Sequence, residues 1–419
     1  MKIVKQKGTK DIYFDEMKAW QYVEKNIRDI AKVYNLNEIR TPVFEATELY
    51  QRGVGDETDV VNKEMYTFLD KGGRSVTLRP ELTAGVVRAY IENGFASEPT
   101  PLKFWYTANM YRYEKMQKGR YREFNQFGVE IFGSDSYLAD LEAIMISRDL
   151  FKRIGLLDDI VLNINSIGCK ECRQKYIEVL KEYIRPHLDN MCDTCKRRFE
   201  TNPMRIIDCK EEKCQEILKN VPLITDYLCE ECGKDFENLK NALDNANISY
   251  NIDKRIVRGL DYYNRTVFEY TTDKLGLALG GGGRYDTLVE TLGGPHTPAV
   301  GFGMGFDRIV LVLKESGKYE TKENDLDVFF SCMTDVAYPK MFNIIQNLRD
   351  NNISCDYDIC KRSFKAGLKY ANKQNAKFVV IIGEDELNKN VCSIKNMQTG
   401  NQEEVNLDAN SIIEYINNK

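Results

Sequence analysis

The segment Gly301-Phe-Gly-Met-Gly-Phe-Asp-Arg308 constrains the fold of this chain more than any other. Glycine alternates there with bulky residues, and this period of two predicts a β-strand with one bare face. The apolar pattern continues to Leu313, so the strand should lead directly into a helix. A bare strand face lets a flat base or ring lie on the sheet, and Arg308 near the helix start is well placed for a phosphate. The segment matches neither a Walker loop nor a dinucleotide fingerprint.

The pattern of apolar residues divides the 419-residue chain into two parts. In the first part, strand-like and helix-like runs follow one another irregularly, with predicted strands at 75–78, 103–106, 127–132 and 266–271 and helices at 15–34, 83–92 and 136–154. After a polar linker at 315–324 they alternate, which predicts a small α/β domain. Its predicted strands are 328–332, 353–357, 377–382 and 391–395, and its helices are 338–350, 363–373 and 411–418. Pro42 interrupts an extended stretch at 37–44, which should therefore lie at a sheet edge or an interface.

Composition limits the classes of function. The formal net charge is -5, so any binding of nucleic acid must use local basic patches. No apolar run approaches the ~20 residues that span a membrane, and the N-terminus has no apolar core of a signal peptide. We therefore expect a cytoplasmic protein whose twelve cysteines are reduced thiols or metal ligands.

Eight of the twelve cysteines lie between residues 169 and 232, in a charged stretch that predicts an insertion with its own small core. Their C-x2-C and C-x4-C spacings suit tetrahedral zinc. One predicted quartet is Cys192, Cys195, Cys209 and Cys214, and the remaining four could form another. The alternative is a set of reduced cysteines in a small core. Catalytic zinc is not expected, because no histidine-containing open ligand set is present.

The segment Arg258-Gly-Leu-Asp-Tyr-Tyr-Asn-Arg-Thr266 combines an arginine with two adjacent tyrosines. The arginine fork suits a carboxylate or a phosphate, and tyrosine rings and hydroxyls can hold a small polar ring. The segment thus predicts a site where an anion and a ring meet, with a solvated strand edge as the alternative. Leu78-Arg-Pro-Glu-Leu-Thr83 places a carboxylate and a hydroxyl at a helix start, where an ordinary helix cap is the alternative.

A basic loop joins two predicted strands between Tyr111 and Glu130. Its cations could cover a polyphosphate or approach an RNA backbone, or they could form a solvated hairpin tip. In the returning strand, Gln126, Gly128 and Glu130 share one face by strict alternation, which predicts a lined pocket above a sheet core. The glycine run 280–283 permits close approach of a ligand, although such runs are also common in flexible loops.

In combination, these segments resemble the histidyl-tRNA synthetases, which are class II aminoacyl-tRNA synthetases. Three stretches, around Pro42, from 111 to 130 and from 301 to 308, are similar in that order to the three class II motifs. Residues 258–264 and 281–286 are similar to signatures of the histidine enzymes. Met116, Asn125 and Asp307 depart from the proline, histidine and glutamate that are common at these positions, and Asn125 and Asp307 could change local hydrogen bonding.

The resemblance covers essentially the whole chain and implies its architecture. The expected fold is an α+β class II catalytic domain at 1–323, with a mostly antiparallel sheet flanked by helices. This domain would include a cysteine-rich helical insertion at 166–250. A C-terminal α/β anticodon-binding domain is expected at 324–419.

The resemblance also implies histidine–tRNA ligase activity in a homodimer. With Mg2+, ATP would activate L-histidine to histidyl-adenylate and release pyrophosphate, and the histidyl group would pass to the 3'-terminal adenosine of tRNA(His). The implied catalytic residues are Arg258 and Arg112. The implied histidine-binding residues are Glu81, Thr83, Arg112, Gln126, Glu130, Arg258, Tyr262, Tyr263 and Tyr285. The implied ATP-binding residues are Arg112, Glu114, Arg120 and Arg308.

The implied tRNA-binding residues are Gln117, Lys118, Arg122, Lys365 and Lys369. The last two belong to a row of lysines at every fourth position from 361 to 377, which would share one face of a helix or simply form its solvated side. One alternative is a non-catalytic synthetase-like regulatory subunit of ATP phosphoribosyltransferase, a class that typically lacks the anticodon domain and disrupts the active-site motifs. Another is a zinc-stapled nucleic-acid-binding protein without catalysis.

Overall fold

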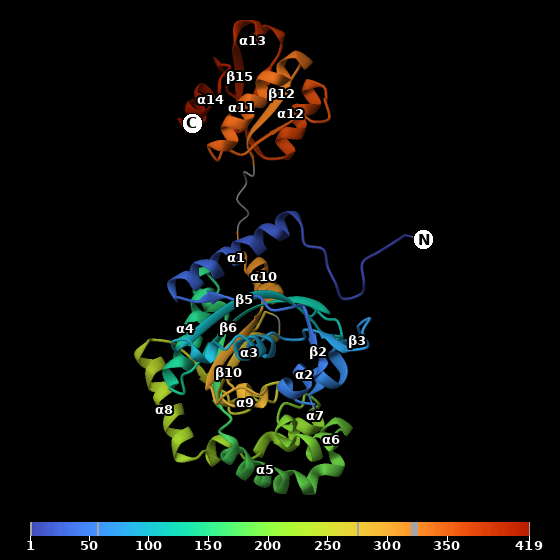
Figure 1. Ribbon diagram of the computed structural model, residues 1–419, viewed down its shortest axis with the longest axis vertical. Helices are drawn as coiled ribbons and strands as arrows, with labels where there is room; N and C mark the ends of the chain where they lie inside the picture. Colours follow the sequence, from blue (N-terminus) through green and yellow to red (C-terminus); the bar gives the residue numbers. More distant parts are fainter. Residues whose placement is uncertain (1, 57, 275, 320–325, 419) are drawn as a thin grey trace. The chain divides into compact units, whose positions relative to one another are not determined.

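The computed structural model describes residues 2–56, 58–274, 276–319 and 326–418. The chain forms two compact units, residues 1–319 and 320–419 (Figure 1). The predicted domain boundary between 323 and 324 lies outside the described residues.

An eight-stranded sheet forms the centre of the first unit, in the order β1-β5-β6-β11-β10-β9-β7-β8. Its strands are β1 (Asn37–Glu38), β5 (Leu102–Tyr111), β6 (Glu123–Phe132), β7 (Val161–Ser166), β8 (Asn251–Ile252), β9 (Asn264–Thr272), β10 (Leu277–Arg284) and β11 (Ala299–Gly305). The two outermost pairs, β1 with β5 and β7 with β8, are parallel. The pairs between them are antiparallel, which confirms the predicted sheet. Strand β1, in the extended stretch that Pro42 interrupts, lies at an edge of the sheet, as predicted from the missing N–H donor of proline.

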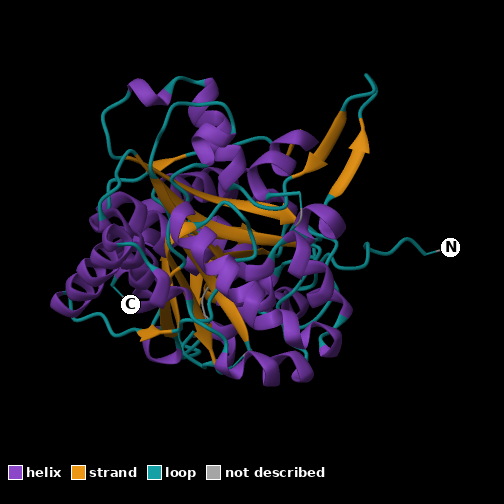
Figure 2. Ribbon diagram, turned by 90° about the horizontal axis from the view of Figure 1, so that it is seen from below, coloured by secondary structure: helices purple, strands orange, loops and turns teal. Residues whose placement is uncertain are grey.

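Helices flank the strands (Figure 2). The helices of the first unit are α1 (Phe14–Val33), α2 (Thr47–Val54), α3 (Thr83–Glu92), α4 (Tyr137–Arg153), α5 (Lys170–Ile184), α6 (Asp193–Thr201), α7 (Glu212–Ile217), α8 (Glu230–Asn245), α9 (Leu288–Thr291) and α10 (Phe306–Glu315). One core joins α1, α4, α8 and α10 to the sheet side chains that include Phe127 and Val129. A three-stranded sheet in the order β2-β4-β3 completes the unit, with β2 (Phe44–Ala46), β3 (Tyr66–Leu69) and β4 (Ser75–Leu78).

The cysteine-rich insertion has no core of its own, so this part of the prediction is wrong. Tyr176 and Leu180 of α5 and Phe199 of α6 join the same cluster as Tyr106 and Phe132 of the sheet. Figure 1 shows α5, α6 and α7 together, at the end of the first unit opposite to α1. Such short amphipathic helices cannot enclose their apolar faces alone, so they share the core of a larger neighbour.

The second unit holds a five-stranded sheet in the order β13-β12-β14-β15-β16. Its elements are β12 (Leu326–Cys332), α11 (Tyr338–Asp350), β13 (Cys355–Tyr357), α12 (Phe364–Lys373), β14 (Ala376–Ile382), α13 (Glu384–Lys389), β15 (Val391–Asn396), β16 (Gln402–Asn406) and α14 (Ala409–Asn417). The alternation confirms the predicted α/β class, although β16 and α13 were not predicted. Helix α12 is too short for the predicted five-lysine face, since Lys361 precedes it and Lys377 lies in β14.

No helix in the described ranges combines the length and apolar character needed to cross a membrane.

Candidate active site

A cavity of about 650 Å³ lies over the first unit's sheet. This volume falls within the range of small-molecule sites, which is about 300–1,000 Å³. Residues from β5, β6, β9, β10 and β11 line it, together with segment 253–263. Ten residues that the sequence predicted at the site line this cavity together: Glu81, Thr83, Arg112, Glu114, Arg120, Gln126, Arg258, Tyr262, Tyr263 and Arg308.

A buried carboxylate, Glu130 of β6, lies behind the cavity wall. Thr83 Oγ1 and Tyr106 Oη donate hydrogen bonds to Glu130 Oε1 at 2.8 and 3.0 Å. Tyr285 Oη donates to Glu130 Oε2 at 2.5 Å. Burial raises the pKa of Glu130 to about 8, because these three donors offset only part of the cost of an ionised group away from water. Glu130 and Tyr285 do not themselves line the cavity; they hold Thr83 and Tyr106, which do.

Glu81 is a helix cap and a cavity residue at once. Its carboxylate accepts hydrogen bonds from the backbone N–H groups of Thr83 at 2.8 Å and Ala84 at 2.9 Å, where α3 begins. Tyr262 Oη donates to the same carboxylate at 3.5 Å. Burial raises the pKa of Glu81, and the two amide donors oppose that rise. The geometry confirms the cap and places the same carboxylate in the cavity lining, and its role in binding stays a prediction.

Three tyrosine rings lie close together, and two of them, Tyr262 and Tyr263, line the cavity. The ring centroids of Tyr262 and Tyr263 are 4.6 Å apart, and those of Tyr262 and Tyr285 are 5.7 Å apart. The Arg258 guanidinium lies 5.6 Å from the Tyr263 ring. The segment from Arg258 to Thr266 therefore places a cation beside tyrosine rings, and the anion and ring ligand that it predicts stay a prediction.

Arginines also line the cavity, among them Arg112, Arg258 and Arg308. Arg258 Nη1 donates to Glu269 Oε2 at 2.8 Å, whereas its buried Nε has no hydrogen-bond partner in the described part of the chain. Arg112 Nε donates to the carbonyl of Pro80 at 2.7 Å. This carbonyl orients the Arg112 guanidinium, and Arg112 Nη1 lies 3.8 Å from Glu114 Oε1.

Arg308 is the cation at the start of α10 that the sequence singled out. Its Nε donates to the carbonyl of Gly119 at 3.0 Å and its Nη1 to that of Ala278 at 2.6 Å. Burial lowers the pKa of Arg308, and repulsion from Arg120 and Arg112 lowers it further. Glu114 and Glu269 oppose part of this effect, and a polyanionic ligand would relieve the repulsion among the arginines further.

The glycines of β11 do not all have the predicted use. At Gly301 the space beside the strand is filled by the protein, since an added Cβ would overlap Glu130 Oε2. The expectation of a flat ligand at that position is therefore wrong. At Gly303 an added Cβ would come no closer than 3.6 Å, to Gln126, and Gly303 and Gly305 do line the cavity. Gly280 and Gly281 of the glycine run line it as well.

The residues expected to meet tRNA lie outside the cavity. Lys118 Nζ pairs with Glu315 at 2.5 Å, and the Arg122 guanidinium lies 3.6 Å from the Tyr113 ring. Gln117 is exposed at the tip of the basic loop. Lys365 and Lys369 are exposed on α12 of the second unit. Arg120 of the same loop does reach the cavity, and its Nε lies 3.3 Å from Glu114.

Comparison with known proteins identifies the family. The model of the family described as histidyl-tRNA synthetase matches residues 8–309, and that described as anticodon binding domain matches residues 327–419. The chain belongs to the histidyl-tRNA synthetase family.

Individual relatives agree with this membership over 97–100% of their length. The chain is 50% identical to the histidine–tRNA ligase of Acetivibrio thermocellus over 404 residues, 96% of this chain and 97% of that protein. It is also 50% identical to the histidine–tRNA ligase of Clostridium perfringens over 417 residues, 99% of this chain and 100% of that protein. The apo histidyl-tRNA synthetase of S. aureus has a similar structure, with a TM-score of 0.83 and 38% identity over 99% of this chain and 100% of that one.

Asn125 and Asp307, where altered hydrogen bonding was expected from the sequence, contact each other. The backbone N–H of Asn125 donates to Asp307 Oδ2 at 2.7 Å, and Lys10 Nζ lies 2.9 Å from the other oxygen of that carboxylate. Asn125 and Asp307 both line the cavity. The Asp307 carboxylate thus links β6 to the start of α10, and the neighbouring Arg308 lies in the cavity wall.

Sequence reasoning missed three residues of this histidyl-tRNA synthetase site. Tyr106 lies opposite Gly128 in the β5–β6 register, and its ring occupies the space where a Cβ of residue 128 would be. A polar strand face with a central glycine was the available signal for a large ring on the neighbouring strand. Glu269 and Arg205, which bind the side chain and the carbonyl of Arg258, come from distant segments and had no local signal.

Proposed function

We propose that this chain is a histidine–tRNA ligase that activates L-histidine with ATP and transfers the histidyl group to tRNA(His). The supporting observation is that one cavity is lined both by hydrogen-bonding acceptors with tyrosine rings and by arginines. Glu81, Thr83, Tyr262 and Tyr263 line it together with Arg112, Arg258 and Arg308. Histidine needs acceptors for its ammonium and ring N–H and cations for its carboxylate, and ATP needs the cations.

Selection of the amino acid depends on the carboxylates and the hydroxyl groups that they bind. Glu81 accepts from the α-ammonium group, and the Glu130 network, through Thr83 and Tyr106, sets the hydrogen bonding around the imidazole. Gln126, Tyr262, Tyr263 and Tyr285 complete or support the ring pocket. An amino acid without a ring N–H would leave buried polar groups unpaired, and sites of this kind discriminate strongly.

Adenylate formation brings two anions together. A carboxylate oxygen of histidine attacks the α-phosphorus, the bond to the β-phosphate oxygen breaks, and pyrophosphate leaves. Arg112 and Arg258 offset the repulsion and stabilise the charge that develops on the α-phosphate. Arg308 holds the γ-phosphate, with Arg120 beside it, and Glu114 lies near the adenine.

Mg2+ prefers oxygen ligands and is usually shared between protein carboxylates and substrate phosphates. The cavity fits such an ion, because Glu114 and Glu269 line it and each already has an arginine partner. These carboxylates would hold Mg2+ together with the phosphate oxygens, and the ion would neutralise phosphate charge when bound.

The remaining assignments concern partners. Gln117, Lys118 and Arg122 approach the acceptor end of the tRNA, while Lys365 and Lys369 contact phosphates near the anticodon.

A cytoplasmic homodimer is proposed by family resemblance, and exposed Val43 and Phe44 beside Pro42 support an apolar interface there. Light scattering coupled to gel filtration tests the dimer, and a monomer at micromolar concentration would contradict it.

Histidine-dependent ATP–pyrophosphate exchange in the presence of Mg2+ tests the ligase proposal. Arg258→Ala should lower the exchange rate by a factor of about 100 to 1,000, the typical effect of removing one donor to a developing charge. Arg153→Ala, which removes an exposed arginine at the end of α4, is the control and should leave the rate unchanged. A folded wild-type protein without exchange would overturn the proposal and favour the regulatory-subunit alternative.

A further inference from the structure

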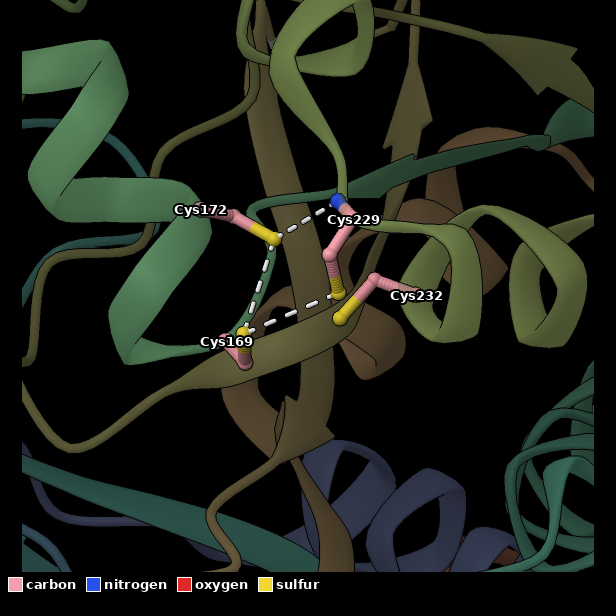
Figure 3. A group of neighbouring side chains, drawn as sticks. All are labelled: Cys169, Cys172, Cys229 and Cys232. Atoms are coloured by element: carbon pink, nitrogen blue, oxygen red, sulfur yellow. Dashed lines mark hydrogen bonds between the residues drawn. The ribbon is translucent and has the colours of Figure 1, made fainter.

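Eight cysteines of the insertion gather in two compact groups. Cluster A consists of Cys169, Cys172, Cys229 and Cys232 (Figure 3), and cluster B consists of Cys192, Cys195, Cys209 and Cys214. Within each cluster the four Sγ atoms all lie within 4.8 Å of one another. All eight are free thiols. We propose that each cluster binds one structural Zn2+ ion through four thiolates.

The sulfur spacing fits a single tetrahedral ion. A Zn–S bond of about 2.3 Å places tetrahedral sulfurs about 3.8 Å apart. In cluster A, Cys169 Sγ lies 3.5 Å from Cys172 Sγ and 4.0 Å from Cys229 Sγ. In cluster B, Cys192 Sγ lies 3.8 Å from Cys209 Sγ. Disulfide sulfurs would be only about 2 Å apart, and a polynuclear iron–sulfur cluster would hold its ligating sulfurs farther apart.

The local backbone suits an anionic centre at these positions. In all three C-x2-C pairs the first cysteine is the N-cap of a helix and the second is that helix's third residue, in α5, α6 and α8. Helix N-termini stabilise negative charge, such as that of a zinc–tetrathiolate centre. Backbone N–H groups also donate to the sulfurs, from Cys229 to Cys172 at 3.1 Å and from Cys192 to Cys214 at 3.3 Å.

Packing of reduced cysteines in an apolar core does not account for the clusters. The second unit has four further cysteines, at 332, 355, 360 and 392, and in the described residues they form no comparable group. Each cluster instead joins segments that are distant in sequence, since Cys172 and Cys229 are separated by 57 positions. Two arginines, Arg173 and Arg265, interact electrostatically with the cluster A sulfurs and would offset the negative charge of a zinc–tetrathiolate centre.

The clusters lie where the insertion holds the active-site segment. Beside cluster A, Arg265 N donates to the carbonyl of Gly168 at 2.9 Å, and Arg173 Nη1 donates to the carbonyl of Tyr263 at 3.1 Å. Arg205 lies in sequence between the two cysteine pairs of cluster B, and its Nη1 donates to the carbonyl of Arg258 at 2.7 Å. Because the insertion has no separate core, the two ions would fix the helices that support residues 258–265.

Metal analysis of untagged protein, purified with a reductant and without chelators, tests the proposal. The expected result is two zinc ions per chain. Cys172→Ser and Cys195→Ser should each lower the content to one, and the double variant should lower it to none. Cys360→Ser is the matched control, since Cys360 is exposed in the second unit, and it should retain two.

If a variant fails to fold, cobalt substitution in the wild-type chain still tests the two-site proposal. Protein produced with Co2+ should contain two cobalt ions and show the strong absorption of tetrahedral cobalt–thiolate sites. A folded wild-type protein with reactive thiols and fewer than two bound zinc ions would overturn the two-site proposal, as would stoichiometric iron in place of zinc. The metal count does not depend on aminoacylation, so it can succeed or fail separately from the ligase proposal.

Discussion

Substitution of Gly301 by alanine tests the packing of β11 against the buried Glu130 side chain. An added Cβ would overlap Glu130 Oε2 and lie 2.6 Å from the carbonyl oxygen of Val129. The carbonyl belongs to the β6–β11 ladder and the carboxylate is held by Thr83 and Tyr285, so neither can move freely. Overpacking costs about 1–3 kcal/mol, and a displaced hydrogen bond to a buried group costs a similar amount. We expect Gly301→Ala to lose about 2–6 kcal/mol of unfolding free energy.

Gly303→Ala is the matched control on the same strand. The nearest atoms to its added Cβ, in the Gln126 side chain, are 3.6 Å away, which is ordinary van der Waals contact. Its stability should stay within about 0.5 kcal/mol of the parent. Thermal unfolding followed by circular dichroism should separate the two variants by several degrees, at about 2 °C per kcal/mol for a unit of this size.

The same pair of variants separates stability from function. Gly301→Ala should raise the KM for histidine more than the KM for ATP, because Glu130 holds Thr83 and Tyr106 at the proposed histidine pocket. Equal unfolding temperatures for Gly301→Ala and Gly303→Ala would refute the argument that Glu130 occupies the bare face of β11.

Three further predictions concern the same network and the second unit. Tyr285→Phe removes a donor to buried Glu130 and should lower the unfolding free energy by about 1–3 kcal/mol, measured by urea denaturation; an unchanged midpoint would contradict that hydrogen bond. Because burial raises the pKa of Glu130 from the ordinary 4.5 to about 8, the folded state retains a proton that the unfolded state loses as pH rises through this window. Stability should therefore fall between pH 4.5 and 8 more steeply in the parent than in Glu130→Gln, and parallel pH profiles of melting temperature would refute the shift. Lys365→Ala with Lys369→Ala should weaken tRNA binding and reduce its salt dependence without affecting pyrophosphate exchange, whereas Lys389→Ala, exposed on α13, should change neither.

Local periodicity was sufficient for much of the fold. The alternation of glycine with apolar residues from Gly301 predicted a strand that continues into a helix, and β11 and α10 follow one another there. Alternation also predicted the opposite faces of β6, with Glu130 on the polar one and Phe127 and Val129 in the core. Short elements such as β16 and α13 escaped prediction, because they are stabilised by sheet pairing and packing rather than by a long apolar repeat.

The sequence by itself determined the chemical groups of the site and their order along the chain. Arg112, Arg258 and Arg308 are cations whatever the fold, and the cysteine spacings favour tetrahedral metal in any context. Only the tertiary structure decided which groups meet. It brought Tyr106 against Glu130, gave Arg258 its partner Glu269, and filled the face of Gly301 with a carboxylate instead of a ligand. These contacts join segments far apart in sequence, and burial among them, rather than residue type, sets the protonation of Glu130.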